Sequence, residues 1–455
     1  MTPAPIALSA LLLFAAPQDP PVVVAHYRLG DQVRAIDMDE IALEMAFHLV
    51  RKQEGREAVR HLCDTRLVTE AARRLLVLPD SREVEAFRAK LAALVPAGPD
   101  GSEQRRTIAR LPSEELASSM AFDRLVRKAL EMPPDEPVSS DMRKLWLAEE
   151  RERHQIVDDP DALPVGSALR IDGVDVPMLL LGRLLAFKAT AEQIEGYVRQ
   201  IVLLRSLEAM AAERGIRVGR EDLEAELAER AREVEADPRY RGISFAELLK
   251  SQGFTEESLL RSNVFRASVL QRKLAEVVHP RSEFLAALAA DRAAILERYG
   301  ARRRIRGIFL RAMEHPNELI PRTFEQAASK LEELAGKANT VPFERLAMVE
   351  SEHGESKTRG GDLGFVARRE PGFPEPLLAA AFALQPETIS SPIRCGDGVW
   401  IVEVVEAEPD PPDDVILRRW RDKSIEEQMR SMLERAAIRL EPPYGPGADQ
   451  GTKAK

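Results

Sequence analysis

The chain has 455 residues, which is too long for one compact domain and predicts roughly two to four. Hydrophobic residues at 44% suffice to build cores, whereas charged residues at 31% and aromatic residues at only 5% favour long solvated helices over an all-β sandwich. The net charge of -10, from 65 Lys and Arg against 75 Asp and Glu, excludes a global basic field for gathering nucleic acid. The chain's two cysteines, Cys63 and Cys395, exclude a disulfide-rich scaffold and a zinc cluster of cysteines.

An uncharged apolar run, IALSALLLFAA, occupies residues 6–16. It has the length of a signal-peptide core and is too short to span a bilayer. Residues 1–5 contain no Lys or Arg, so only the terminal amine supplies the positive charge that usually precedes such a core. We predict export to the periplasm or another extracytoplasmic space, with residues 1–20 as a signal peptide or as an anchor that gives peripheral membrane association. The alternative is a frayed apolar helix of a cytosolic protein.

One helical pattern occurs twice before Pro280, at an offset of about 140 residues. Each copy is predicted to open with a short strand-like piece and to continue as helices, with Gly215 ending one helix of the second copy. The matching segments are residues 33–41 with 169–177, 66–87 with 206–227, 111–130 with 254–276, and 139–155 with 281–299. The alternative is chance similarity between two amphipathic regions rich in Ala, Glu and Arg.

After Gly300 the pattern changes to mixed strands and helices. Residues 302–312, RRRIRGIFLRA, predict a buried strand, residues 323–337 an amphipathic helix, and the segment around Gly396 and Gly398 a strand pair. The predicted order is β-α-α-β-α-β-β. One further helix is predicted at 413–440, before a tail rich in Pro and Gly that is predicted to be disordered.

Two motifs in this region carry a family resemblance. Residues 351–365, SEHGESKTRGGDLGF, contain a serine, a loop and Gly-Gly-Asp-Leu-Gly, and residues 379–393 read AAAFALQPETISSPI. In this order and spacing they resemble the parvulin-type (PpiC, or rotamase) peptidyl-prolyl cis-trans isomerases. The glycine pair also has a physical interpretation of its own, since glycines tolerate positive φ and let the chain turn tightly into a strand.

The helical region in front, especially residues 245–276, is similar to the chaperone modules of the SurA and PrsA foldases. The resemblance implies a mainly α protein with two such helical modules, a C-terminal α+β parvulin-like domain, and a last helix that packs back on the helical core. The predicted division is 1–20 for the signal or anchor, 21–160 and 161–300 for the modules, 301–408 for the isomerase domain, and 409–455 for the C-terminal helix and tail.

The resemblance also implies site residues. The pocket for the proline ring would be lined by Leu363, Phe373, Leu377, Phe382 and Trp400, and the polar candidates are His353, Cys395 and Asp397. The two histidines that are common in the family fall at Gly307 and Trp400. Each of three residues also has an alternative interpretation. His353 is then a solvated loop histidine, Trp400 a residue of the core, and Cys395 an unreactive thiol.

Isomerisation of an X-Pro bond needs no nucleophile, metal or cofactor, because its barrier is the partial double bond of the amide. The first hypothesis is therefore an exported foldase that isomerises X-Pro bonds of unfolded client proteins. The second is a non-catalytic periplasmic holdase or assembly chaperone, whose degenerate parvulin domain only binds clients; the missing histidines favour it. The third is a helical scaffold that contacts nucleic acid or a membrane through Arg302–Arg304 and Arg418–Arg419. We expect no nucleic-acid partner, since arginines entering a strand are more simply a solvated edge.

Overall fold

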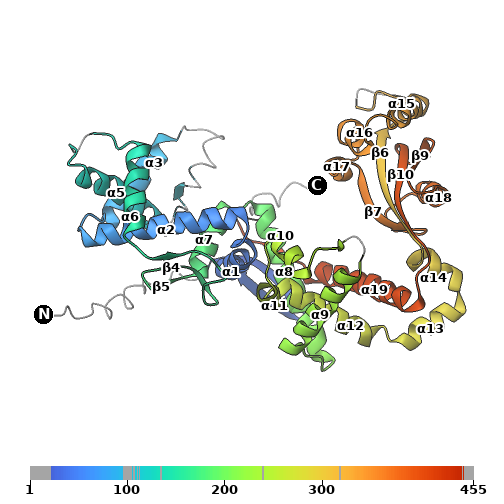
Figure 1. The fold of residues 1–455 in the computed structure, drawn as a ribbon, viewed down its shortest axis with the longest axis horizontal. Coiled ribbons are helices and arrows are strands. Elements are labelled where there is room, and N and C mark those ends of the chain that lie inside the picture. The colour runs from blue at the N-terminus through green and yellow to red at the C-terminus, as the bar shows by residue number, and fades with distance from the viewer. Residues whose placement is uncertain are drawn as a thin grey trace, which may run out of the picture. The chain divides into compact units, whose positions relative to one another are not determined.

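The computed structural model describes residues 22–95, 105, 108–109, 111, 113–133, 136–237, 240–316, 319–442 and 444. Two compact units make up the chain (Figure 1): one spans Met1–Leu270 and Ser431–Lys455, the other Gln271–Arg430. The first is mostly helical and the second contains an antiparallel sheet, so the predicted mainly α fold with a C-terminal α+β domain is confirmed. The apolar run at 6–16 and most of the predicted tail lie outside the described residues.

The first unit combines long helices with two small sheets. Its elements are β1 (Val23–Leu29), β2 (Gln32–Asp37), α1 (Met38–Leu49), α2 (Gln53–Arg74), α3 (Ser81–Leu94), α5 (Ser113–Ala129), α6 (Ser140–Glu152), β3 (Ile156–Val157), β4 (Ser167–Ile171), β5 (Val174–Pro177), α7 (Met178–Lys188), α8 (Ala191–Glu213), α9 (Arg220–Ala236), α10 (Phe245–Ser251), α11 (Glu256–Leu260), the first half of α12 (Asn263–Val278), and β11 (Arg439–Leu440). No helix among the described residues is long and apolar enough to cross a membrane.

The order β-hairpin, short helix, long helix occurs twice, as β1-β2-α1-α2 and as β4-β5-α7-α8. Helices α1 and α7 begin at Met38 and Met178, at the offset of the sequence repeat. The predicted strand at 33–41 is wrong in its second half, because Asp37 caps α1 by accepting a hydrogen bond from the Glu40 amide. Strand β1 was not predicted, although Gly30 marks its turn with a positive φ of 59°.

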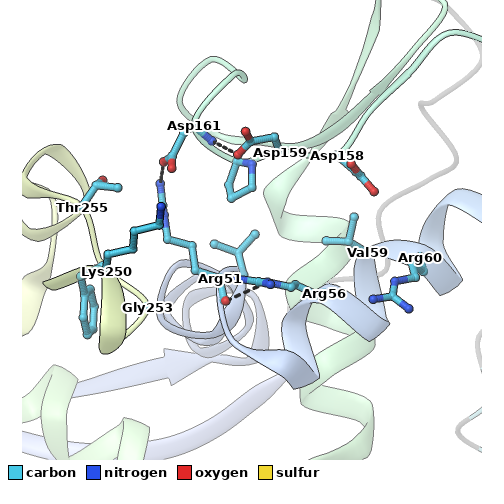
Figure 2. Close-up of a pocket in the computed structure, with 13 residues that line it drawn as sticks. Arg51, Arg56, Val59, Arg60, Asp158, Asp159, Asp161, Lys250, Gly253 and Thr255 are labelled. Atoms are coloured by element: carbon cyan, nitrogen blue, oxygen red, sulfur yellow. Dashed lines mark hydrogen bonds and ion pairs between the residues drawn. The ribbon is translucent and has the colours of Figure 1, made fainter. Parts of the chain in front are cut away.

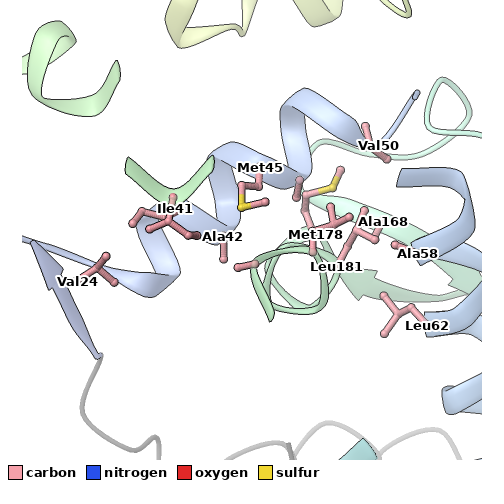
Figure 3. Packing of buried hydrophobic residues seen from close by; sticks show 14 of the residues in the cluster. Val24, Ile41, Ala42, Met45, Val50, Ala58, Leu62, Ala168, Met178 and Leu181 are labelled. Atoms are coloured by element: carbon pink, nitrogen blue, oxygen red, sulfur yellow. The ribbon is translucent and has the colours of Figure 1, made fainter. Parts of the chain in front are cut away.

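Helices α1 and α7 pack directly on each other, and their closest approach brings Ala42 against Gly182. These residues occupy equivalent positions in the two copies. Figure 3 shows the buried cluster around this contact, in which Ile41 and Met45 of α1 lie with Leu181 of α7. The two predicted helical modules therefore share one core. The five-part division of the chain stays a prediction.

The C-terminal segment returns to this core. Strand β11 pairs antiparallel with β1, with Ala25 opposite Leu440, and Ala436 is buried in the shared cluster. The predicted helix at 413–440 therefore ends too late: α19 (Asp413–Ala436) stops where Ala437 takes a positive φ of 44°, because the next residues are needed as a strand.

The second unit holds the sheet. Its elements are the second half of α12, then α13 (Arg281–Ala290), α14 (Arg292–Tyr299), β6 (Arg302–Arg311), α15 (Phe324–Lys337), α16 (Phe343–Glu350), α17 (Gly354–Lys357), β7 (Asp362–Ala367), α18 (Glu375–Ala383), β8 (Thr388–Ile389), β9 (Ile393–Cys395), β10 (Gly398–Glu408) and α19 up to Arg430. The single helix predicted at 281–299 is wrong, because Asp291 leaves helical geometry and caps α14 by accepting from the Ala294 amide.

All strands of this sheet pair antiparallel, in the order β7-β6-β10-β8, with β9 also on β10. Alternate residues of β6 point to opposite faces: Ile308 packs with α15 and α16, whereas Ile305 and Phe309 pack with α18. The predicted β-α-α-β-α-β-β order is confirmed, with α17 and β8 as short additions. The sheet thus presents one face to two helices and the other to α18 and the motif loop.

The contact of α1 with α7 has no room for a side chain at Gly182. A Cβ there would overlap the backbone carbonyl of Ala42, so we expect Gly182→Ala to lower the free energy of unfolding by about 1–3 kcal/mol. Gly196→Ala in α8 is the matched control, because nothing lies near its Cβ position and alanine favours helix by up to about 1 kcal/mol. Urea unfolding followed by circular dichroism measures both. Equal stability of the two variants would contradict this packing.

Helices α2 and α8 share their last two hydrogen bonds, one to the third and one to the fifth preceding residue, but the residue in the left-handed conformation is Leu76 in one and Gly215 in the other. Leu76 is 91% exposed, so its side chain contributes almost no packing. We expect Leu76→Gly to raise the free energy of unfolding by about 1 kcal/mol, since it removes the strain of a Cβ at positive φ. Leu76→Ala keeps that strain and should leave stability unchanged. Destabilisation by Leu76→Gly in the same urea titration would refute the strain.

Candidate functional site

The motif loop between α16 and β7 is anchored on strand β6. Ser351 is fully buried, and its hydroxyl accepts hydrogen bonds from the amides of Phe309 (3.2 Å) and His353 (3.3 Å). The Glu352 amide donates to the Phe309 carbonyl at 2.8 Å, and its carboxylate accepts from the Arg311 amide at 2.7 Å. The loop therefore continues the edge of the sheet, and its position is fixed by backbone contacts.

The glycine pair brings the loop close to the centre of β6. Gly360 and Gly361 have φ of 67° and 79°, as the sequence predicted, and the Gly307 amide donates to the Gly361 carbonyl at 2.8 Å. A Cβ on Gly361 would lie 2.6 Å from the Gly307 carbonyl oxygen. Glycine is required here because both the backbone conformation and the close approach exclude a side chain.

Asp362 of the motif stabilises the start of β7. Its carboxylate accepts from Arg304 Nη2 at 2.7 Å and from the Gly364 amide at 2.9 Å. Burial raises the pKa of Asp362, but these hydrogen bonds and the positive charges of Arg304 and Arg306 outweigh burial and lower it. The carboxylate is thus a charged structural anchor beside the site.

Trp400 fills the space that a side chain at position 307 would need. A Cβ on Gly307 would lie 2.8 Å from the indole Cζ3 and 2.9 Å from Leu363 Cδ1. The indole is 7% exposed and stacks obliquely on Phe309, with ring centroids 4.8 Å apart. Gly307 and Trp400, where the family commonly has histidines, are therefore one complementary pair: a large residue occupies the volume of both.

The histidine of the loop lies against this indole. The ring of His353 has its centroid 5.1 Å from that of Trp400, and its Nδ1 is hydrogen-bonded to Ser356 Oγ at 2.8 Å. Ser356 is fully buried and its carbonyl accepts from the Gly361 amide. Within the described part of the chain, Nε2 of His353 has no hydrogen-bond partner, so this nitrogen remains able to bind a polar group.

The predicted pocket residues differ in their exposure. Leu363 and Phe373 are half-buried at the border of the apolar cluster, whereas Leu377 is fully buried inside it and supports them from behind. Phe382 lies apart from this cluster, with the guanidinium of Arg303 5.1 Å and that of Arg368 4.5 Å from its ring centre.

The other two polar candidates are placed differently. Cys395 is buried at 5% exposure in the apolar cluster, and burial raises the pKa of its thiol, which keeps it protonated. Asp397 lies in the β9–β10 turn, where its backbone carbonyl accepts from the Ala312 amide at 3.0 Å. The structure thus brings His353, Leu363, Phe373 and Trp400 together and leaves Asp397 in the turn.

Sequence reasoning missed the two buried serines. Ser351 fixes the loop and Ser356 orients the histidine, but a serine in a polar loop carries no sequence signal of burial. The arginines of the third hypothesis are engaged within the domain: Arg304 pairs with Asp362, and Arg419 donates to Glu408 and to the Gly300 carbonyl. Across the described ranges, no three His, Cys, Asp or Glu side chains gather in a way that would hold a metal.

Comparisons with known proteins place this geometry in a family. Residues 310–406 match the family model "PPIC-type PPIASE domain". A search of curated proteins gives no match. Among solved structures, the peptidyl-prolyl isomerase ESS1 from Candida albicans is 24% identical, with a TM-score of 0.20; the match covers 23% of this chain and 63% of that chain, less than two thirds of its length.

Two solved foldases match a longer part of the chain. The foldase protein PrsA from Streptococcus pneumoniae is 19% identical, with 56% of this chain and 86% of that chain covered and a TM-score of 0.25. PrsA from Bacillus subtilis is also 19% identical, with 58% and 89% covered and a TM-score of 0.21. The family model, the motif loop and the antiparallel sheet agree: residues 310–406 of this chain are a parvulin-type, or PpiC-type, peptidyl-prolyl cis-trans isomerase domain.

Proposed function

We propose that this protein is an exported foldase that catalyses cis-trans isomerisation of X-Pro bonds in unfolded extracytoplasmic proteins, while its helical unit holds the client chain. The observation that carries this proposal is the apolar cluster of the isomerase domain with the His353 ring lying on Trp400. The apolar run at residues 6–16 supports export.

The proposed chemistry follows from the barrier of the amide. Rotation about an X-Pro bond is opposed by roughly 18–20 kcal/mol of partial double-bond character, and a catalyst must bind the twisted amide better than either planar form. Leu363 and Phe373 would hold the proline ring, and Trp400 would form the wall behind it. Because their exposed surface is apolar, they fix the ring while the residue before it rotates.

His353 would supply the polar contact. Its Nδ1 is held by Ser356, so its Nε2 is oriented and available to the rotating amide. In the twisted amide, the prolyl nitrogen regains a localised lone pair, so a hydrogen bond donated to this nitrogen is stronger than in the planar forms. This role differs from that of a nucleophile, which the buried and protonated Cys395 does not provide.

A second candidate is a non-catalytic holdase. The specific observation that favours it is the replacement of both family histidines by the interlocking Gly307 and Trp400. Such a domain would keep the apolar surface and bind proline-containing segments without accelerating their rotation. A measurement of isomerase rate separates the two candidates.

We expect His353→Ala to lower kcat/KM for a short Ala-Pro peptide by about tenfold or more, because it removes the imidazole that lies against Trp400 of the apolar cluster. An NMR exchange assay of the cis and trans peptide measures the rate. His315→Ala is the matched control, since His315 is an exposed histidine of the same unit, and it should keep the wild-type rate.

Wild-type protein that fails to accelerate exchange, yet suppresses aggregation of an unfolded client, would establish the holdase instead. An equal loss of isomerase rate in the His353 and His315 variants would show that His353 has no specific role in the site. Failure of the wild type in both assays would refute a foldase.

Introducing the two histidines of the family tests whether positions 307 and 400 share one volume. We expect Gly307→His alone to lower the free energy of unfolding by about 1–3 kcal/mol, because its side chain meets the indole. Adding Trp400→His removes that clash, so the double variant should regain most of the loss. Urea titrations of both single variants and the double variant measure the coupling between the positions. Additive effects of the two changes would show that these residues do not share one volume.

A further inference from the structure

The helical unit contains a large groove. Its cavity volume is about 1130 Å³, and it lies between α1, the loop at 158–166, α8 and the start of α12. Small-molecule sites usually enclose about 300–1,000 Å³. This groove therefore exceeds the size that one compact ligand usually fills, and its volume can hold a short chain segment.

Large apolar side chains are exposed along the groove. Leu43 and Phe47 of α1 are 38% and 41% exposed, Val165 of the loop is 60% exposed, and Val264 of α12 is 61% exposed. Scattered exposed apolar residues are ordinary, but several that line one concave surface indicate a binding site. They come from three separate parts of the chain, which the fold brings to one place.

A chain of hydrogen bonds fixes one polar group in the groove. Lys52 Nζ lies 2.9 Å from His48 Nε2, and His48 Nδ1 lies 2.8 Å from Tyr197 Oη. An ammonium group can only donate, so Nε2 must accept and the imidazole proton sits on Nδ1. The Nδ1–H then donates to Tyr197 Oη. The hydroxyl proton of Tyr197 has no acceptor among the described residues and is available to a bound group.

The protonation states agree with this arrangement. Burial, followed by the charge of Lys52, lowers the pKa of His48, which keeps the imidazole neutral. Burial, with the charges of Glu44 and Glu54, raises the pKa of Tyr197 to about 12, so the phenol keeps its proton at physiological pH. Tyr197 is therefore a hydrogen-bond donor whose own acceptor position is already occupied.

The charged groups of the groove are already paired. The pairs are Arg51 with Asp161, Arg230 with Glu226, Arg261 with Glu257, and Glu44 with the Asn263 amide. The Arg51–Asp161 pair also lines a neighbouring pocket of about 360 Å³, where Figure 2 shows it with Arg56, Arg60 and Lys250. Because each of these arginines already has a carboxylate partner, an anionic ligand in the groove would lose its hydration without gaining a free counter-charge. Glu44 has a neutral amide as its partner, and burial raises its pKa, which weakens it as a counter-charge for a cationic ligand.

We propose that this groove binds an uncharged, extended, apolar segment of an unfolded polypeptide, with a backbone carbonyl of the segment accepting a hydrogen bond from Tyr197. This inference rests on the proposed foldase function and assigns the client-binding surface to the helical unit. Alternate side chains of an extended segment would contact the exposed apolar residues of α1 on one side and of α12 on the other.

The test uses full-length protein and a defined probe. The probe is a ten-residue peptide with blocked ends that alternates apolar and small polar residues and contains no proline, which removes the isomerase domain's preferred ligand. Fluorescence anisotropy measures its affinity. We expect the double variant Leu43→Ser/Phe47→Ser to weaken binding by about tenfold, and Tyr197→Phe by about fivefold, as the loss of one hydrogen bond predicts.

Two controls make the result specific. The double variant Leu94→Ser/Leu145→Ser removes two apolar side chains of the same unit that lie outside the groove and are even more exposed, and it should keep wild-type affinity. The same peptide with two lysines or two glutamates should bind at least tenfold more weakly. Equal binding of charged and uncharged peptides, or self-association of the protein that the groove variant abolishes, would overturn the proposed occupant.

The proposal and the foldase function fail in different ways. Wild-type protein that suppresses aggregation of an unfolded client but does not bind the probe would refute the groove while leaving chaperone activity intact. Probe binding that the groove variant does not weaken would also refute it. Absence of both probe binding and suppression would refute the client-holding function itself.

Discussion

The contact between Ala42 and Gly182 is the constraint on which the helical unit depends. It lets α1 and α7 approach until their backbones touch, and the two copies of the repeat then bury their apolar residues in one cluster. The groove follows from this arrangement, since Phe47 belongs to the first copy and Tyr197 to the second. Two separate modules could not form it. The groove is thus a surface that neither occurrence of the pattern has alone.

In the isomerase domain, the side-chain volumes at two positions compensate each other, and the polar groups of the site lie elsewhere as a result. The absence of a side chain at Gly307 and the presence of an indole at Trp400 compensate each other sterically, so the apolar cluster stays filled. The hydrogen-bonding side chains lie in the motif loop instead. There Ser351 fixes the backbone and Ser356 orients the ring of His353. Fold and apolar surface are maintained while the hydrogen-bonding groups change position.

Local patterns predicted the local features of this protein. The positive φ of Gly360 and Gly361, the order of elements in the last domain and the helix end at Gly215 all follow from short stretches of sequence. Strand β11, the burial of Leu377 and the position of Phe382 between two arginines depend on partners far away in the chain. Hydrophobic periodicity within one segment does not indicate which distant segment will pack against it. A motif likewise gives the type of a residue but not its exposure.

The pairing of β1 with β11 joins the two ends of the described chain, and this has a consequence for when the protein can fold. The shared core of the helical unit gains Ala436 and the strand at Leu440 only when these late residues reach β1 and the cluster behind it. Contacts between such distant segments form slowly, because a long loop must close first. A nascent chain therefore lacks these contacts until residue 440 has been synthesised, and β11 is the last strand to join the core.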